Sequence, residues 1–595
     1  MAHSVMNKLS APHTQGSDHR IAAAMAACSG RLRRDGPILA SVAVRLWLII
    51  AGGQALAGDP SASAAPQATS AGAAPPPPAC APSGSSTGTP SAAGHGELGA
   101  IIDAGTLPDL RWPNFSDYRS AVGKFYDAGG YALVWTKDGA PTAQAQAMIQ
   151  QLKQSQLKGL NPEDYDASRW DGRLAKLAPA TRTPAQTDLV HFDLALTVLA
   201  MRYISDLHIG RINPQHFKFG LDVGPKKIDL AEFLRSQVLP AADVAAVVAT
   251  VERQHGGYRR AEAALAQYLK LASEGDGDPV PTPAKSIRPG NSFAGMPQLV
   301  RRLHQLGDLS SAQGAANGIV YQGAVVDAVK HFQTRHGLEP DGLLGKGTIV
   351  QINKPLSARV RQLQNTLERY RWLPPDFPQP PILVNIPEFK LRTLRRGSGG
   401  YLSMNVVVGK AYQHKTPVFA DEMRYVIFHP YWNVPASIAR AELWPKDARD
   451  PSYLANHGFE VVNGEIRQKP GRKNALGPVK FVFPNSYNVY LHGTPSVSLF
   501  SRARRDFSHG CIRVQDPVAL AAWVLRDKPG WTVDRIRAVI AGSQTMQVNL
   551  DKPIPVLILY STAVVEPNGD VHFFDDIYGY DAELEQALEE EVNRK

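Results

Sequence analysis

The sequence predicts a multidomain α+β protein, and three observations support this class. The chain has 595 residues, which is too long for one hydrophobic core and suggests about three or four domains. Apolar residues recur at helical spacing through residues 98–275 and 293–353. From Ile382 onward the pattern changes to short β-rich runs separated by glycine and proline. We therefore expect helical domains first and a sheet domain last.

Residues 1–57 have the order of an export signal. Arg31-Leu32-Arg33-Arg34 precedes an apolar run from Ile38 to Ala51, and Ala55-Leu56-Ala57 offers a small-x-small cleavage site. Because the run is short and interrupted, a cleaved signal peptide and an uncleaved signal anchor both remain open. Six basic and two acidic residues in this segment supply 6 − 2 = +4 of the formal charge of +10. The remaining +6 is ordinary for a soluble protein, and we expect no nucleic-acid partner.

Changes in composition divide the rest of the chain into segments. We expect a Pro/Ala/Ser-rich disordered linker (58–97), a helical scaffold (98–275), a second linker (276–292), a three-helix unit (293–353), a connecting helix (354–380), a mixed β-sheet domain (381–545) and C-terminal strands and a helix that complete it (546–595). Within the sheet domain, residues 433–477 break the strand rhythm and predict short helices at 436–443 and 450–456. Aromatic residues in this insertion favour an ordered structure.

The three-helix unit carries a recognisable motif. Leu299, Leu303 and Leu306 form one apolar stripe, and a second stripe runs from Val325 to Phe332 at helical spacing. The run Ala328-Val329-Lys330-His331-Phe332-Gln333, followed by Asp-Gly-x-x-Gly, resembles the peptidoglycan-binding type 1 domain. Many of these positions are core residues, so the motif supports the fold more firmly than it supports binding.

The chemistry-bearing residues gather in two stretches, Leu491-His492-Gly493-Thr494 and Phe507 to Arg513. A thiol becomes a strong nucleophile as thiolate, so Cys511 is the candidate nucleophile and His492 the candidate base. Gly510 lets a substrate carbonyl and backbone N–H donors come close. The chain has three cysteines, and an exported protein normally keeps a free thiol only for chemistry.

This arrangement, His-Gly, then Ser-His-Gly-Cys-Ile-Arg after the fifteen residues from Gly493 to Phe507, resembles the signature of the YkuD-type L,D-transpeptidase catalytic domain. The helical scaffold, the phrase Glu368-Arg369-Tyr370-Arg371-Trp372-Leu373-Pro374 and the insertion resemble the large YcbB-like subgroup of that family. The resemblance implies that the insertion is a helical cap over the active site.

The resemblance also implies acyl transfer. The Cys511 thiolate would attack the carbonyl of an L-centre in a tetrapeptide stem, release D-alanine, and pass the acyl group to an amine of a second stem as a 3→3 cross-link. His492 would act as general acid and base, and the Gly510 N–H as an oxyanion donor. Substrate binding or loop support is expected from the remaining site residues: Gly493, Ser508, His509, Arg513, Trp432 and Tyr490.

Other readings stay open at this point. An L,D-carboxypeptidase or an enzyme that attaches lipoproteins to the wall would use the same residues. A zinc hydrolase with His492, His509 and Cys511 as ligands, and a catalytically dead wall-binding scaffold, rank lower. We expect no cofactor and no metal. Expected partners are donor and acceptor peptidoglycan stems and covalent inhibitors of the carbapenem β-lactam class, in the periplasm of a Gram-negative-type bacterium, with membrane contact only through an uncleaved signal anchor.

Overall fold

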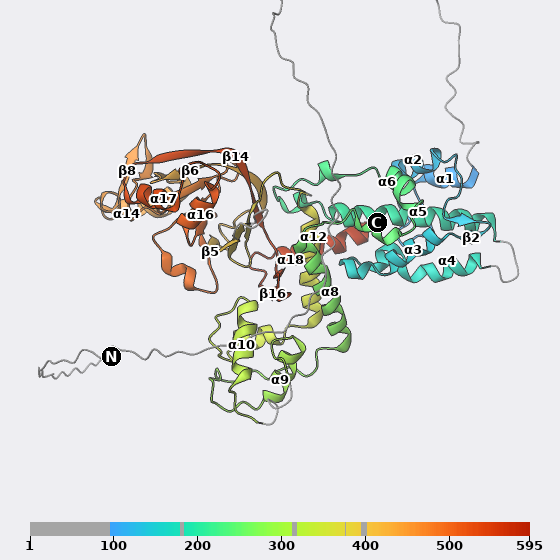
Figure 1. Cartoon of the computed structure of the whole chain (residues 1–595), viewed down its shortest axis with the longest axis horizontal. Coiled ribbons are helices and arrows are strands. Elements are labelled where there is room, and N and C mark those ends of the chain that lie inside the picture. The colour runs from blue at the N-terminus through green and yellow to red at the C-terminus, as the bar shows by residue number, and fades with distance from the viewer. Residues whose placement is uncertain (1–95, 179–183, 312–317, 375, 394–400, 595) are drawn as a thin grey trace, which may run out of the picture. The chain divides into compact units, whose positions relative to one another are not determined.

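The computed structural model describes residues 96–178, 184–311, 318–374, 376–393 and 401–594 (Figure 1). The predicted signal and nearly all of the predicted linker, together with Cys28 and Cys80, lie outside these residues. Within them, no helix is both long and apolar enough to span a bilayer. Helices fill the chain up to Trp372, and strands dominate from Ile382. The predicted multidomain α+β class is confirmed.

The first helical region surrounds one long, buried helix, α5 (Gln186–Ile209). Sixteen of its 24 residues are buried, so it has no polar face and forms the centre of a helical core. The helices around it are α1 (Gly96–Ala104), α2 (Arg119–Asp127), α3 (Ala143–Lys153), α4 (Trp170–Leu177), α6 (Leu230–Phe233) and α7 (Val244–Ala249). A two-stranded hairpin, β1 (Thr136–Lys137) with β2 (Ala140–Pro141), was not predicted.

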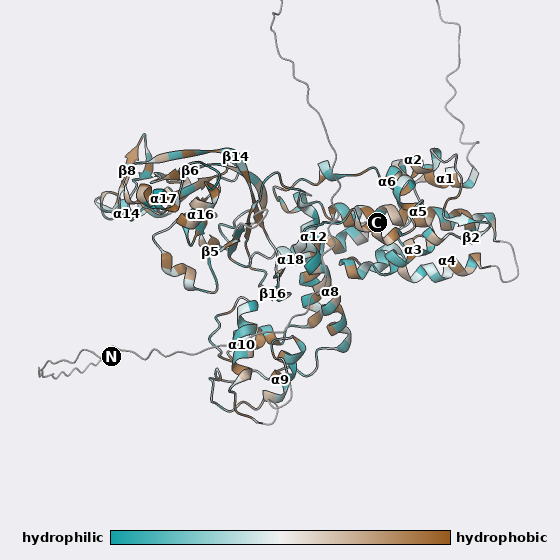
Figure 2. Cartoon of the chain, viewed as in Figure 1, coloured by the Kyte–Doolittle hydropathy of each residue, from teal (hydrophilic) through white to brown (hydrophobic). Residues whose placement is uncertain are grey.

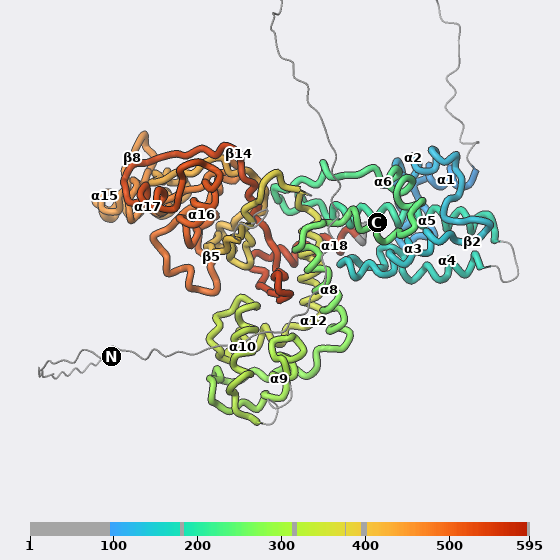
Figure 3. The backbone as a smooth tube through the Cα atoms, viewed as in Figure 1, coloured from blue at the N-terminus to red at the C-terminus, as the bar shows by residue number. Residues whose placement is uncertain are grey.

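Two longer helices, α8 (Gly256–Glu274) and α12 (Leu356–Trp372), pack side by side (Figures 1 and 3). Both carry hydrophobic and hydrophilic residues along their length (Figure 2). Their apolar faces share a core with the hairpin β15 (Ala563–Val565) and β16 (Val571–Phe573). The C-terminal segment is therefore packed against helices that precede the sheet domain in the chain.

The region around residues 293–353 contains the three expected helices: α9 (Met296–Gln305), α10 (Ala324–Arg335) and α11 (Lys346–Ile352). The predicted stripe residues Leu299, Leu303, Val329 and Phe332 are all buried in one cluster, and Leu306 packs partly against it. Helix α10 ends where Gly337 adopts a left-handed φ of 64°, which a residue without Cβ accepts readily.

The C-terminal region is built on a nine-stranded sheet in the order β12-β5-β13-β11-β10-β6-β14-β3-β4. An additional β4–β5 pairing closes the sheet on itself, so the edge strand β4 is paired on both sides. Its strands are β3 (Ile382–Asn385), β4 (Lys390–Thr393), β5 (Leu402–Gly409), β6 (Phe419–Phe428), β10 (Val479–Val482), β11 (Leu491–His492), β12 (Asp506–Ser508), β13 (Ile512–Val514) and β14 (Met546–Leu559). The β-rich run Val489-Tyr490-Leu491 predicts a strand that starts two residues before β11 does, and the run from Pro555 predicts one that starts nine residues after the beginning of β14.

Helix α16 (Pro517–Val524) follows β13 directly. Asp516 caps it by accepting a hydrogen bond from the Ala519 N–H at 2.8 Å, as its sequence position predicts. Helices α17 (Val533–Ala541) and α18 (Tyr580–Arg594) come later in the same region.

The insertion, residues 433–477, is not purely helical as expected. It contains the short helices α13 (Ala436–Ile438), α14 (Trp444–Asp447) and α15 (Tyr453–Asn456) and a π-helical turn at Ala439–Leu443. It also contains a three-stranded sheet of β7 (Trp432–Asn433), β9 (Glu465–Gln468) and β8 (Phe459–Val462). Val434, Ala439, Leu443, Leu454 and Ile466 form its own small core. The insertion is therefore a small folded unit rather than a loop.

Candidate active site

Cys511 lies in the tight turn between β12 and β13. Gly510 has a φ of 113°, a backbone conformation that residues with a side chain rarely adopt. The Ser508 hydroxyl donates to the Cys511 carbonyl at 2.5 Å, and the Thr416 hydroxyl donates to the Gly510 carbonyl at 2.8 Å. These two hydrogen bonds hold the backbone of the turn in one conformation and so determine the position of the Cys511 side chain.

Gly510 was expected to offer its N–H to an oxyanion. In this structure that N–H donates to the Ser508 hydroxyl oxygen at 3.2 Å. A substrate oxyanion would have to compete for this donor, and the role of Gly510 stays a prediction.

His492 is buried, with 5% of its surface exposed, at the end of β11. Its Nδ1 lies 2.5 Å from the Gly493 carbonyl oxygen, and since a carbonyl can only accept, Nδ1 carries the proton. Burial, helped by the nearby Arg513 and Lys480 cations, lowers the pKa of His492 to about 3. The imidazole is therefore neutral at physiological pH, with its lone pair on Nε2.

His492 is oriented by the backbone around Gly493 and not by an acidic side chain. A Cβ on Gly493 would lie 2.9 Å from the Pro478 ring, so this close approach of two chain segments requires glycine. The carboxylate of Asp506 is paired with Arg504 at 2.7 Å and does not reach the imidazole. A backbone carbonyl therefore does the orienting that an acid performs in other Cys–His sites.

Cys511 is a half-buried, free cysteine whose thiol donates weakly to the Asn488 carbonyl at 3.7 Å. Burial raises the pKa of the Cys511 thiol. Hydrogen bonds from the Tyr490 backbone and hydroxyl groups, and the charges of Lys480 and Arg513, act in the opposite direction on that pKa. Because His492 is neutral, these groups rather than an imidazolium are available to stabilise a thiolate.

Tyr490 connects the thiol to the insertion. Its hydroxyl is hydrogen-bonded to Cys511, and it also has a side-chain hydrogen bond with Trp432 of β7. The Tyr490 ring lies 5.6 Å from the His492 ring, centroid to centroid. Trp432, predicted as a support residue on sequence grounds, thus lies two hydrogen bonds away from the nucleophile.

His509 makes a second connection to the insertion. Its Nε2 lies 2.7 Å from a carboxylate oxygen of Glu442, which is in the π-helical turn. The ring of His414 lies 4.9 Å from that of His509. Neither Glu442 nor His414 was singled out in the sequence, because charged residues of a short helix or loop have no periodic signal.

Lys480 is the other functional candidate that sequence reasoning missed. Its ammonium nitrogen lies 3.8 Å from the centroid of the Tyr490 ring. The sequence did contain a signal for Lys480. It lies between two buried residues of a strand, Val479 and Phe481, and because side chains alternate along a strand it points to the face opposite the core.

The zinc reading has no geometric support among the residues that the structure describes. No group of three histidine, cysteine or acidic side chains there is arranged to hold a metal ion. His492 Nδ1 and His509 Nε2 both have protein partners instead.

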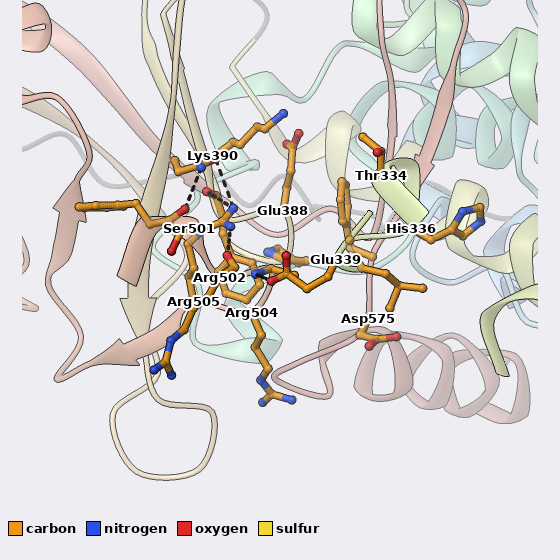
Figure 4. Close-up of a pocket in the computed structure, with 18 of the residues that line it drawn as sticks. Thr334, His336, Glu339, Glu388, Lys390, Ser501, Arg502, Arg504, Arg505 and Asp575 are labelled. Atoms are coloured by element: carbon orange, nitrogen blue, oxygen red, sulfur yellow. Dashed lines mark hydrogen bonds between the residues drawn. The ribbon is translucent and has the colours of Figure 1, made fainter. Parts of the chain in front are cut away.

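A separate cleft of about 630 Å³ is lined by neither Cys511 nor His492. It lies between residues 334–340, the β4 region and the loop 497–505 (Figure 4). Glu339 there accepts a hydrogen bond from the Ala503 N–H at 2.5 Å. Arg502, Arg504 and Lys390 also line the cleft, which shares no residue with the Cys511 turn.

Comparison with known proteins finds family matches for three stretches of the chain. Residues 380–541 match the L,D-transpeptidase catalytic domain, residues 294–352 a domain described as "Putative peptidoglycan binding domain", and residues 120–265 the scaffold domain. The chain therefore carries a YkuD-type L,D-transpeptidase catalytic domain together with a peptidoglycan-binding domain and a scaffold domain, as the sequence resemblance predicts.

Two individual proteins are similar to this chain. A Haemophilus influenzae protein named "Putative L,D-transpeptidase" is 34% identical over 248 residues, 38% of this chain and 49% of that protein. The match thus spans about half the length of the curated relative. A crystal structure of an L,D-transpeptidase from Stackebrandtia nassauensis covers 47% of this chain and 97% of its own, at 15% identity and a TM-score of 0.21. That structural likeness is too low to bear on the fold.

Proposed function

We propose that this protein is a peptidoglycan L,D-transpeptidase that forms 3→3 cross-links with Cys511 as nucleophile. The observation that carries the proposal is that, inside the stretch that matches the catalytic domain, a free half-buried thiol follows the short β12 strand, while the adjacent pairing of β11 with β13 carries a neutral histidine whose Nδ1 proton is committed to a carbonyl. This combination suits nucleophilic acyl transfer, because the Nε2 lone pair is available to take the thiol proton.

The proposed reaction has two half-reactions. In the first, His492 Nε2 takes the Sγ proton, Sγ bonds to the carbonyl carbon of the L-centre, and the C–N bond to the D-residue breaks. The proton passes from His492 to the leaving amine, so D-alanine departs and a thioester remains. In the second, an amine of another stem attacks the thioester, loses its proton to His492, and releases Cys511 as thiol.

The oxyanion of each tetrahedral intermediate needs N–H donors. We propose the Cys511 N–H, together with the Gly510 N–H if Ser508 releases it on substrate binding. Ser508 and Thr416 would then hold the turn in shape, and Trp432 and Tyr490 would support the donor peptide beneath the insertion. Carbapenem-type β-lactams would acylate the same thiol.

Two further parts of the proposal rest on the sequence. Export to a periplasm fits the basic–apolar–small order of residues 1–57 and the retention of a free thiol. Wall binding by the region 293–353 fits its domain match. Fractionation of cells for the protein, and pull-down on purified peptidoglycan, test these parts separately.

The decisive experiment is incubation of the purified protein with disaccharide-tetrapeptide, followed by mass spectrometry. A dimer that retains one D-alanine is the expected product, and the Cys511→Ala variant should yield none. A tripeptide without dimer would instead indicate carboxypeptidase action. Activity that survives in Cys511→Ala would overturn the mechanism.

A further inference from the structure

Three neighbouring strands bring Lys480, His492 and Arg513 into one row. Lys480 of β10 pairs directly with His492 of β11, and His492 pairs directly with Arg513 of β13. Residues in direct register point to the same face of a sheet, with neighbouring Cβ atoms about 5 Å apart. The catalytic imidazole is therefore flanked by a cation on each side.

Neither cation has an acidic partner in the part of the chain that the structure describes. Burial lowers the pKa of Lys480 and of Arg513, and the Cys511 sulfur acts in the opposite direction when it is a thiolate. Other cations of this region have oxygen partners: Arg392 pairs with Glu388 and Glu566, Arg467 pairs with Glu460, and Arg505 donates to the backbone carbonyls of Arg502 and Phe389. Holding two half-buried, unpaired cations costs desolvation energy, which an incoming anion would offset.

The position of the row fits an anion next to the scissile bond. Lys480 lies over the Tyr490 ring, and the Tyr490 hydroxyl is hydrogen-bonded to the Cys511 sulfur. In a donor stem that ends one residue beyond the scissile bond, the terminal carboxylate follows the attacked carbonyl by one residue, about 3.8 Å along the chain. When the Cys511 sulfur attacks that carbonyl, the carboxylate would therefore also lie close to the sulfur.

We propose that Lys480, with Arg513, binds the free carboxylate of the donor's C-terminal D-residue and so restricts the enzyme to stems that end there. This inference rests on the proposed transpeptidase function and assigns it a specificity-determining residue. A stem extended or amidated at this point would leave both cations without an anionic partner, so it should react poorly.

The test compares two donors, a disaccharide-tetrapeptide with a free C-terminal carboxylate and the same compound as C-terminal amide. The wild-type protein should prefer the acid by about 30-fold in kcat/KM, as expected for one desolvated charge pair. Lys480→Met should lose about 30-fold on the acid, mainly through KM, and less than about threefold on the amide. Lys480→Arg should restore most of the preference, and Lys390→Met, on β4 of the same sheet, should change neither donor.

The outcomes separate the two proposals. If the wild-type protein releases no D-alanine from the acid donor, the proposed function itself fails. If it is active but treats acid and amide alike, the carboxylate site is overturned. Equal losses on both donors in Lys480→Met, with an equal loss in the alkylation rate of Cys511 by the neutral reagent iodoacetamide, would also overturn it, since the whole effect of Lys480 would then come from stabilising the thiolate and none from binding a carboxylate. A thermal melt of each variant establishes that the fold is retained.

Discussion

Glu442 of the insertion and His509 of the Cys511 turn form a hydrogen-bonded pair, with 2.7 Å between the carboxylate oxygen and Nε2. The pair joins the insertion, which has its own small core, to the loop that carries the nucleophile. With Trp432 and Tyr490 it makes two polar connections between the insertion and the site. Both connections are made by polar side chains.

The first prediction concerns this pair. Glu442→Gln should loosen the insertion, so amide hydrogen exchange in residues 436–456 should accelerate. Both side chains are partly exposed, so overall stability should fall by less than about 1 kcal/mol. Glu460→Gln is the matched control, because Glu460 is paired with Arg467 and Lys469 inside the insertion. Equal exchange changes in both variants would mean that Glu442 does not latch the insertion to the turn.

The second prediction is a pH profile. Because burial raises the pKa of Cys511, the thiolate fraction should grow about tenfold per pH unit up to and beyond the usual thiol range near pH 8.5. His492, with a pKa of about 3, stays neutral throughout, so no imidazolium–thiolate pair should form at acidic pH. The rate of Cys511 alkylation by iodoacetamide, followed by mass spectrometry from pH 5 to 10, should therefore rise steadily. A flat rate between pH 5 and 8 would contradict this assignment.

The third prediction isolates the Tyr490 hydroxyl. Tyr490→Phe removes the hydroxyl hydrogen bonds to Cys511 and Trp432 but keeps the ring beneath Lys480. A hydrogen bond to a charged sulfur contributes about 1.5–3 kcal/mol, so acylation of Cys511 should slow by roughly 10- to 100-fold. Tyr487→Phe, at an exposed tyrosine of the same loop, serves as the control. Unchanged acylation in Tyr490→Phe would show that the hydroxyl does not act on the thiol.

The features that could be predicted from the sequence depend on residues that are close together in the chain. The stripes Leu299–Leu303 and Val325–Phe332 became buried helix faces, and Asp516 became a helix cap, because spacing along the chain determines them. The hairpin of β8 and β9 was missed although Asn463-Gly464, both at positive φ, is a strong turn signal between two short alternating runs. A missed turn dipeptide accounts for the expectation of a helical insertion.

The contacts between site residues on different strands and loops could not be predicted from the spacing of residues along the chain. Lys480, His492 and Arg513 come from three different strands, and the strand order β10-β11-β13 places them in a row. Glu442 and His509 are 67 positions apart. Long-range register depends on how the closed sheet assembles, which the spacing of residues within one strand does not encode.

The last prediction concerns the C-terminal segment, where Asp581 forms a buried ion pair with Arg369 of α12 and accepts a hydrogen bond from Thr562. Asp581→Asn should destabilise the protein by about 3 kcal/mol, or roughly 6–12 °C in Tm, because it leaves a buried guanidinium without its counter-ion. Replacing both partners by leucine should cost less than the single change, since no charge then remains buried. Glu585→Gln, which disrupts a mostly exposed pair with Arg361, should shift Tm by less than about 2 °C. Thermal unfolding followed by tryptophan fluorescence measures the stability of all three variants. If the double variant is less stable than Asp581→Asn, the ion pair itself stabilises the C-terminal segment, and the loss in Asp581→Asn is not caused by an unpaired Arg369 charge.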